Sequence, residues 1–179
     1  MNERSVFHLI SDITQEQGVS CVLIGGFAIN FYRVARQTAD VDFLITKDDF
    51  KKIANVLENA GYKRISIEEN FAQLESSQLS LMDVDFVFVD QGTLKQIINE
   101  GKQIEIVGQK FCVPSLLHLI ALKLHAIKNN PKNRLMKDLP DIVNLVRINE
   151  IDVEDKEFKD ICLKYATADV YAKIVETFK

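Results

Sequence analysis

The chain has few cysteines, no long apolar run and no excess of positive charge. Its three cysteines, Cys21, Cys112 and Cys162, lie far apart among apolar residues. Their odd number excludes a fully paired disulfide framework, and none of their spacings is that of a zinc site. We therefore expect buried free thiols in a reducing compartment. No stretch approaches the roughly 20 apolar residues that a membrane-spanning helix needs.

The amino terminus lacks the apolar run after a basic segment that is typical of a secretory signal, so we expect a cytoplasmic protein. A net charge of −4 and a pI near 5.4 argue against a general nucleic-acid-coating protein, which is usually basic. One local basic cluster leaves two interpretations open, an RNA-contacting patch or a solvated helix and loop. Its members are Lys123, Lys128, Lys132, Arg134 and Lys137.

The composition is that of an ordinary globular protein, with 47% apolar and 27% charged residues among 179. Helical and strand patterns alternate up to residue 113, and the pattern is helical from Pro114 onward. We predict an α/β (α+β) fold with a mixed β-sheet flanked by helices. Residues 1–113 would form the core, and residues 114–179 a C-terminal helical segment packed on it. Thr46 and Thr93 are the expected N-caps of helices over 47–60 and 93–99.

Gly25 and Gly26 stand between an apolar strand pattern at 21–24 and a helical pattern at 27–33. Glycine lets the backbone approach a phosphate closely, and a helix N-terminus offers free N–H groups to an anion. A tight turn from strand to helix needs glycine for structural reasons as well. A dinucleotide-binding fold has no other support, because the three-glycine fingerprint is absent.

Two Asp-x-Asp pairs lie on predicted strands, Asp40-Val41-Asp42 and Asp83-Val84-Asp85. Residues two apart in a strand point to the same face, so paired carboxylates repel each other unless a cation lies between them. Hard oxygen ligands suit Mg²⁺ or Mn²⁺. The alternative is a solvated strand end where the aspartates merely face water.

A third ligand would come from the second pair if the two strands are neighbours. We favour Asp85 over Asp83, because it lies deeper in the apolar run at 86–89, where an unpaired carboxylate is costly. Three carboxylates can hold two metal ions ~3.5–4 Å apart, an arrangement suited to in-line displacement at phosphorus.

The segment Lys137-Asp138-Leu139-Pro140-Asp141 follows Lys123 by fourteen residues. The two lysines could neutralise phosphates. A local structural role is equally open, in which Asp138 caps a helix over 139–148 and Pro140 occupies its first turn. Pro131 would then separate this helix from one over 115–127.

These motifs resemble those of the nucleotidyltransferase superfamily with the polymerase-beta-like fold. The signature is a Gly-Gly or Gly-Ser turn, then Asp-x-Asp on a strand, then a distant carboxylate; here thirteen residues separate Gly26 from Asp40. The strings at 24–28 and 36–43 are similar to one branch in particular. That branch contains small antibiotic-modifying nucleotidyltransferases and the abortive-infection toxins of type IV toxin–antitoxin systems, which also carry a Lys-Asp-x-x-Asp segment.

The resemblance implies transfer of a nucleoside monophosphate from a triphosphate, such as ATP, to an acceptor hydroxyl with release of pyrophosphate. The implied catalytic and metal-binding residues are Asp40, Asp42 and Asp85, with Mg²⁺ or Mn²⁺ as cofactor. The implied nucleotide-binding residues are Gly25, Gly26, Arg36, Thr38, Lys123 and Lys137. The acceptor could be a small molecule, a protein or an RNA, and an antitoxin is a candidate partner. The alternative is a non-catalytic member of the same fold that binds a nucleotide or a partner protein.

Overall fold

The computed structural model describes residues 5–78 and 81–179. These form two units: one holds the chain up to Ala28 together with Gln37–Pro114, and the other holds Ile29–Arg36 and Ser115–Lys179. The chain therefore passes from the first unit to the second within a single short helix.

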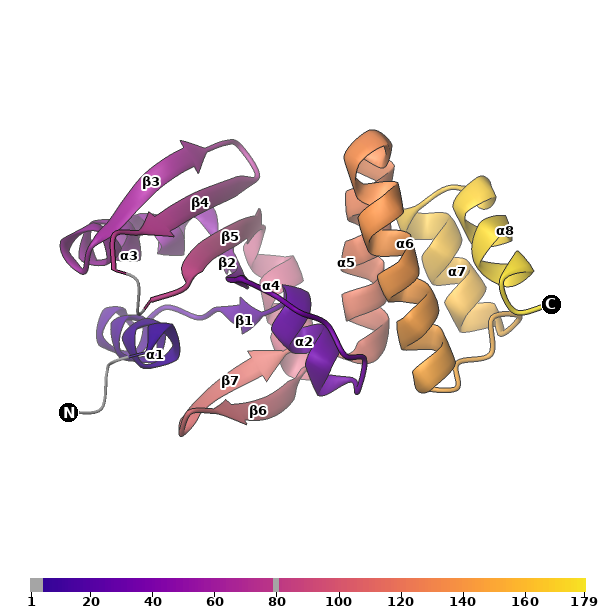
Figure 1. The fold of residues 1–179 in the computed structure, drawn as a ribbon, viewed down its shortest axis with the longest axis horizontal. Helices are drawn as coiled ribbons and strands as arrows, with labels where there is room; N and C mark the ends of the chain where they lie inside the picture. The colour runs from indigo at the N-terminus through magenta and orange to yellow at the C-terminus, as the bar shows by residue number, and fades with distance from the viewer. Residues whose placement is uncertain (1–4, 79–80) are drawn as a thin grey trace. The chain divides into compact units, whose positions relative to one another are not determined.

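The first unit contains a mixed seven-stranded sheet with the strand order β3-β4-β5-β2-β1-β7-β6 (Figure 1). The pairs β2–β5 and β1–β7 are parallel, and the other neighbours are antiparallel, so the prediction of a mixed sheet is confirmed. The elements are α1 (Val6–Gln17), β1 (Val22–Leu23), α2 (Gly25–Phe31), β2 (Asp40–Thr46), α3 (Lys47–Asn59), β3 (Tyr62–Ile67), β4 (Phe71–Ser76), β5 (Asp83–Val89), α4 (Gln91–Glu100), β6 (Lys102–Ile106) and β7 (Gln109–Val113).

The core of this unit lies around the parallel strands β2 and β5. Phe43 and Phe86 are directly opposite each other in the register, both are fully buried, and their rings stack with centroids 5.9 Å apart. Phe50 of α3 packs on Phe86 with centroids 5.2 Å apart. This apolar layer fixes which face of each strand is buried, and therefore which face the intervening residues occupy.

Two helix starts in this unit test the capping predictions. Thr46 caps α3 as expected, since its hydroxyl accepts a hydrogen bond from the backbone N–H of Asp49 at 3.1 Å. The prediction for Thr93 is wrong, because α4 begins at Gln91 and its N-cap is Asp90. The Asp90 carboxylate accepts hydrogen bonds from both the backbone N–H and the hydroxyl of Thr93. Aspartate is a better N-cap than threonine, and this moves the start by one turn.

Residues 115–179 of the second unit contain four helices, α5 (Leu116–Asn129), α6 (Pro131–Ile148), α7 (Lys156–Tyr165) and α8 (Ala168–Glu176). Helix α5 packs against α6 and α7, and α7 packs against α8. The prediction that Pro131 separates two helices is correct, but the predicted start at Leu139 is wrong. Pro131 is itself the first residue of α6, a position where its missing N–H has no partner to lose.

Because α6 starts so early, Asp138 and Pro140 lie inside the helix rather than at its start. The predicted capping role of Asp138 is therefore wrong. Pro140 removes one helical hydrogen bond, the one that the carbonyl of Met136 would accept. Asp138 and Asp141 are instead buried polar residues within this helical unit, with exposed fractions of 3% and 4%.

Candidate active site

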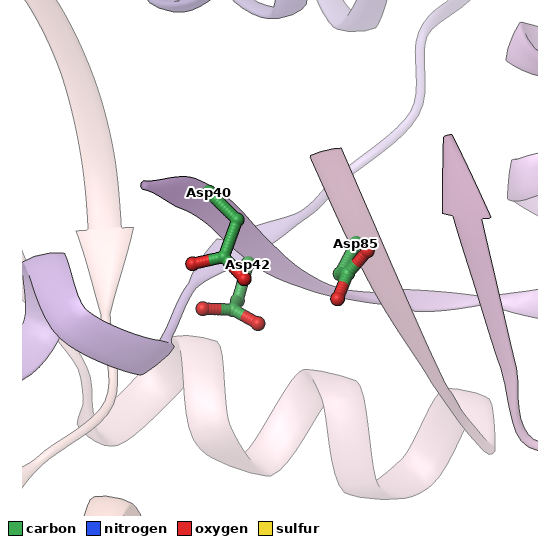
Figure 2. A group of neighbouring side chains, drawn as sticks. All are labelled: Asp40, Asp42 and Asp85. Atoms are coloured by element: carbon green, nitrogen blue, oxygen red, sulfur yellow. The ribbon is translucent and has the colours of Figure 1, made fainter. Parts of the chain in front are cut away.

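The register of β2 and β5 brings the two Asp-x-Asp pairs side by side. Asp42 lies directly opposite Asp85, and Asp40 opposite Asp83. Because the strands are parallel, both pairs lie where the strands begin. Figure 2 shows the side chains of Asp40, Asp42 and Asp85 extending to the same side of the two strands. One oxygen from each of these three carboxylates lies within 4.8 Å of the others.

The donor set of this group fits a divalent cation. All three ligands are hard carboxylate oxygens, the type that Mg²⁺ and Mn²⁺ prefer. Each aspartate is partly exposed, so a cation can reach the group. The group carries three negative charges at short range, and a cation would relieve their mutual repulsion. The described residues thus contain a possible metal site, built from the aspartates that the sequence pattern indicated.

Asp83 takes no part in this group. It is exposed, and its carboxylate accepts a hydrogen bond from the backbone N–H of Ser76 at 2.8 Å. The geometry therefore favours Asp85 over Asp83 as the third carboxylate, although the catalytic roles themselves stay predictions.

The two glycines make room for other residues of the site. Gly25 has a φ of +62°, and a Cβ atom there would overlap the carboxylate of Asp42. A Cβ atom on Gly26 would lie 2.6 Å from the Cβ of Thr38. The backbone N–H of Ile24 also donates to the carbonyl of Asp42 at 2.9 Å. The turn after β1 is therefore built against β2, and this is a structural reason for both glycines.

Two side chains outside the group donate hydrogen bonds to its carboxylates. Thr38 Oγ1 donates to Asp40 Oδ1 at 2.8 Å, and Gln73 Nε2 donates to Asp85 Oδ2 at 3.2 Å. Thr38 was expected from the sequence, whereas Gln73 was not. Gln73 lies on β4 directly opposite Asp85. Only the register of β4 on β5 reveals it, and nothing local to Gln73 signals that register.

The remaining selected residues lie in the helical unit. Lys123 Nζ donates to Asp138 Oδ1 and to Asp141 Oδ2, both at 2.8 Å. Arg36 Nη1 donates to Asp141 Oδ1 at 3.2 Å. Asp138 Oδ2 is buried without a hydrogen-bond partner among the described residues. Lys137 is exposed. The structure thus groups Lys123 and Arg36 with two buried aspartates and leaves Lys137 outside that group.

The cysteines are free thiols, but only Cys162 is buried; Cys21 and Cys112 are partly exposed, so the prediction of buried thiols holds for Cys162 alone. Burial raises the pKa of the Cys21 thiol to about 12, with the nearby Cys112 as a second cause, and burial also raises the pKa of Cys162 to about 12. Thiols that stay protonated at neutral pH are poor nucleophiles.

None of the helices in the described part of the chain combines the length and the hydropathy that a membrane span requires.

The model of the family described as "Nucleotidyl transferase AbiEii toxin, Type IV TA system" matches residues 9–178. The chain belongs to the AbiEii nucleotidyltransferase toxin family. Among curated proteins, none matches this chain in sequence.

Solved structures similar to this AbiEii-family chain include antibiotic nucleotidyltransferases. The antibiotic-resistance factor ANT(2'')-Ia has a TM-score of 0.64 at 14% identity, over 96% of this chain and 94% of that one. The lincosamide antibiotic adenylyltransferase LnuA has a TM-score of 0.53 at 16% identity, over 78% and 93%. An antigenic nucleotidyltransferase-like protein from Paracoccidioides brasiliensis has a TM-score of 0.54 at 14% identity, over 94% and 89%. At these identities the likeness shows a nucleotidyltransferase-like fold.

Proposed function

We propose that this chain transfers a nucleoside monophosphate from a nucleoside triphosphate to a hydroxyl group of an acceptor, with release of pyrophosphate. Membership of a nucleotidyltransferase toxin family supports this reaction class. The observation that carries the proposal is the convergence of Asp40, Asp42 and Asp85 within 4.8 Å at the start of two parallel strands.

In the proposed reaction, the acceptor oxygen forms a bond to the α-phosphorus, and the bond from that phosphorus to the bridging oxygen breaks. Pyrophosphate leaves with the electron pair of that bond. When bound at the three carboxylates, Mg²⁺ or Mn²⁺ would neutralise the negative charge that develops on the phosphate oxygens. One carboxylate of the group accepts the proton of the acceptor hydroxyl, as a general base.

The nucleotide-binding residues stay part of the proposal. Thr38 lies beside the carboxylates, since it donates to Asp40. Arg36 and Lys123 are cationic, the charge that a phosphate needs, and a triphosphate would compete for them with the Asp141 carboxylate that both bind in this structure. The proposed contacts to the triphosphate are Gly25, Gly26, Arg36, Thr38, Lys123 and Lys137. The family's toxin–antitoxin context makes a cognate antitoxin the proposed partner.

Thermal unfolding with each nucleoside triphosphate, with and without Mg²⁺, tests the proposal. A triphosphate at about 100 times its dissociation constant should add roughly 2.7 kcal/mol. For a chain of this size that is a rise in Tm of about 5–11 °C. We expect one triphosphate to give a Mg²⁺-dependent shift that Asp42→Asn and Asp85→Asn lose. Asp83→Asn is the matched control, because it removes an aspartate of β5 outside the group, and it should keep the shift.

A label-transfer assay with the stabilising triphosphate, labelled at the α-phosphate, then searches for the acceptor among small molecules, proteins and RNA. If Asp42→Asn transferred label as fast as wild type, the three aspartates would not be the catalytic group. If no triphosphate shifted the Tm of wild type, a non-catalytic partner-binding role would replace the proposed one.

A further inference from the structure

We propose that Gln73 is a positioning residue of the active site, which holds Asp85 in the orientation that binds the metal ion. The inference rests on the proposed function, because it concerns the cation that the three aspartates would bind. Gln73 is exposed on β4, outside the carboxylate group, and its side-chain amide donates to Asp85 Oδ2 at 3.2 Å.

The sheet register explains why Gln73 reaches this carboxylate. Asp85 has Asp42 directly opposite on the parallel strand β2 and Gln73 directly opposite on the antiparallel strand β4. Directly opposed residues share a face of the sheet, so the three side chains form one row across it. Asp85 lies in the middle of that row, with a negative charge on one side and an amide donor on the other.

The charges of the row show what the hydrogen bond does. Repulsion from Asp40 and Asp42 favours rotamers of Asp85 that turn away from the group, and a carboxylate on a single-bonded stem has several rotamers available. The amide restricts Asp85 by binding one of its two oxygens. Glutamine is neutral, so it orients the carboxylate without adding a positive charge that would compete with a cation.

A second carboxylate of the group is held in a similar way. Thr38 Oγ1, also a neutral donor, binds Asp40 Oδ1 at 2.8 Å. Two of the three metal-binding candidates thus have a neutral hydrogen-bond donor from outside the group. Partners of this kind fix the orientation of metal ligands, and their loss typically weakens metal binding or activity by about 10- to 100-fold.

The test measures metal binding directly, on the full chain without nucleotide. Mn²⁺ is titrated into wild type, Gln73→Met, Gln103→Met and Asp42→Asn, and free Mn²⁺ is followed by electron paramagnetic resonance. Methionine keeps the length of glutamine but cannot donate. Gln103→Met makes the same change on an exposed residue of β6, at the opposite edge of the same sheet.

We expect Gln73→Met to weaken Mn²⁺ binding by about 10-fold or more, and Gln103→Met to match wild type. The Tm without metal should differ little among wild type, Gln73→Met and Gln103→Met, because both glutamines are exposed and surface substitutions usually change stability by about 0.5 kcal/mol or less. That combination separates positioning of a ligand from a general effect on the sheet.

Two results would overturn the inference in different ways. If wild type binds Mn²⁺ in an Asp42-dependent manner and Gln73→Met binds it equally well, Gln73 has no positioning role and the proposed function stands. If wild type shows no Asp42-dependent Mn²⁺ binding, the metal site fails, and both the proposed function and the role of Gln73 fail with it.

Discussion

Removal of the Lys123 ammonium should destabilise the helical unit strongly, whatever its effect on catalysis. Lys123 Nζ lies 2.8 Å from an oxygen of Asp138 and 2.8 Å from an oxygen of Asp141. Counted over side-chain atoms alone, the exposed fractions of Lys123, Asp138 and Asp141 are 11%, 4% and 6%, so all three side chains are nearly buried. Lys123→Met keeps most of the aliphatic stem but leaves the two carboxylates without this cation.

The size of the effect follows from what remains around each aspartate. Asp141 keeps Arg36, whose Nη1 lies 3.2 Å away, whereas Asp138 keeps the more distant Arg134, whose Nη1 lies 3.9 Å away. Breaking a buried ion pair by removing one partner typically costs about 3–5 kcal/mol. Since Arg36 still compensates Asp141, we expect the lower end, about 3 kcal/mol. For a chain of 179 residues that corresponds to a fall in Tm of about 6–12 °C.

Chemical and thermal unfolding of Lys123→Met against wild type measures this loss. Lys132→Met is the control, since it removes an exposed lysine of the same unit and should change stability by about 0.5 kcal/mol or less. Adding Asp138→Asn to Lys123→Met should restore part of the stability, because it removes the stranded charge. A Lys123→Met protein within 1 kcal/mol of wild type would refute this reasoning. Such a result would free Lys123 for a purely ligand-binding role.

Two further substitutions, at Gly25 and at Tyr62, have measurable consequences, and Gly18→Ala is the control for the first. Gly25→Ala and Gly18→Ala both place alanine at a φ near +61°, which costs about 1–2 kcal/mol, but only a Cβ on Gly25 meets Asp42. Gly25→Ala should therefore lose more stability than Gly18→Ala in thermal unfolding, because the overlap with Asp42 adds to the backbone strain, and only Gly25→Ala should lose Mn²⁺ binding. Equal Mn²⁺ affinities would contradict the proposed steric role. Burial, with Asp83 as a second cause, raises the pKa of Tyr62 to about 12, against about 10 in an unfolded chain. The stability that this protonated phenol contributes is complete below pH ~10 and is lost as the pH rises towards 12. The difference in free energy of unfolding between wild type and Tyr62→Phe should therefore shrink across that pH range. An advantage that stays constant with pH would show that the phenol does not titrate in this way.

The sequence predicted the parts of the site that depend on local pattern. Asp40, Asp42 and Asp85 could be selected because aspartates two apart at the start of an apolar strand are unusual without a partner. The mixed sheet could be predicted from strand and helix periodicity. What periodicity could not supply was the neighbour of each strand, and for that reason the role of Asp85 depended on an assumption that the register of β2 on β5 confirms.

Other features depended on contacts between distant residues. Gln73 was missed because its importance comes from a cross-strand partner twelve residues away. The start of α6 was placed too late because Pro140 was interpreted as a first-turn residue. In the folded chain, Asp138 and Asp141 are bound by Lys123 from α5, and this tertiary contact lies beyond any rule based on the local sequence.

Because the glycine turn packs closely against β2, which residues can replace Gly25 and Gly26 depends on the side chains of Asp42 and Thr38. Gly26 has an ordinary negative φ, so the obstacle to a side chain there is the Cβ of Thr38, 2.6 Å from where the new atom would lie. Gly25 is restricted twice, by its φ and by Asp42. A descendant that had lost Asp42 would keep only the first restriction on Gly25. A family member in which both Gly25 and Asp42 are replaced would therefore be one that had already lost its catalytic carboxylates. These two positions can be checked in a sequence without a structure.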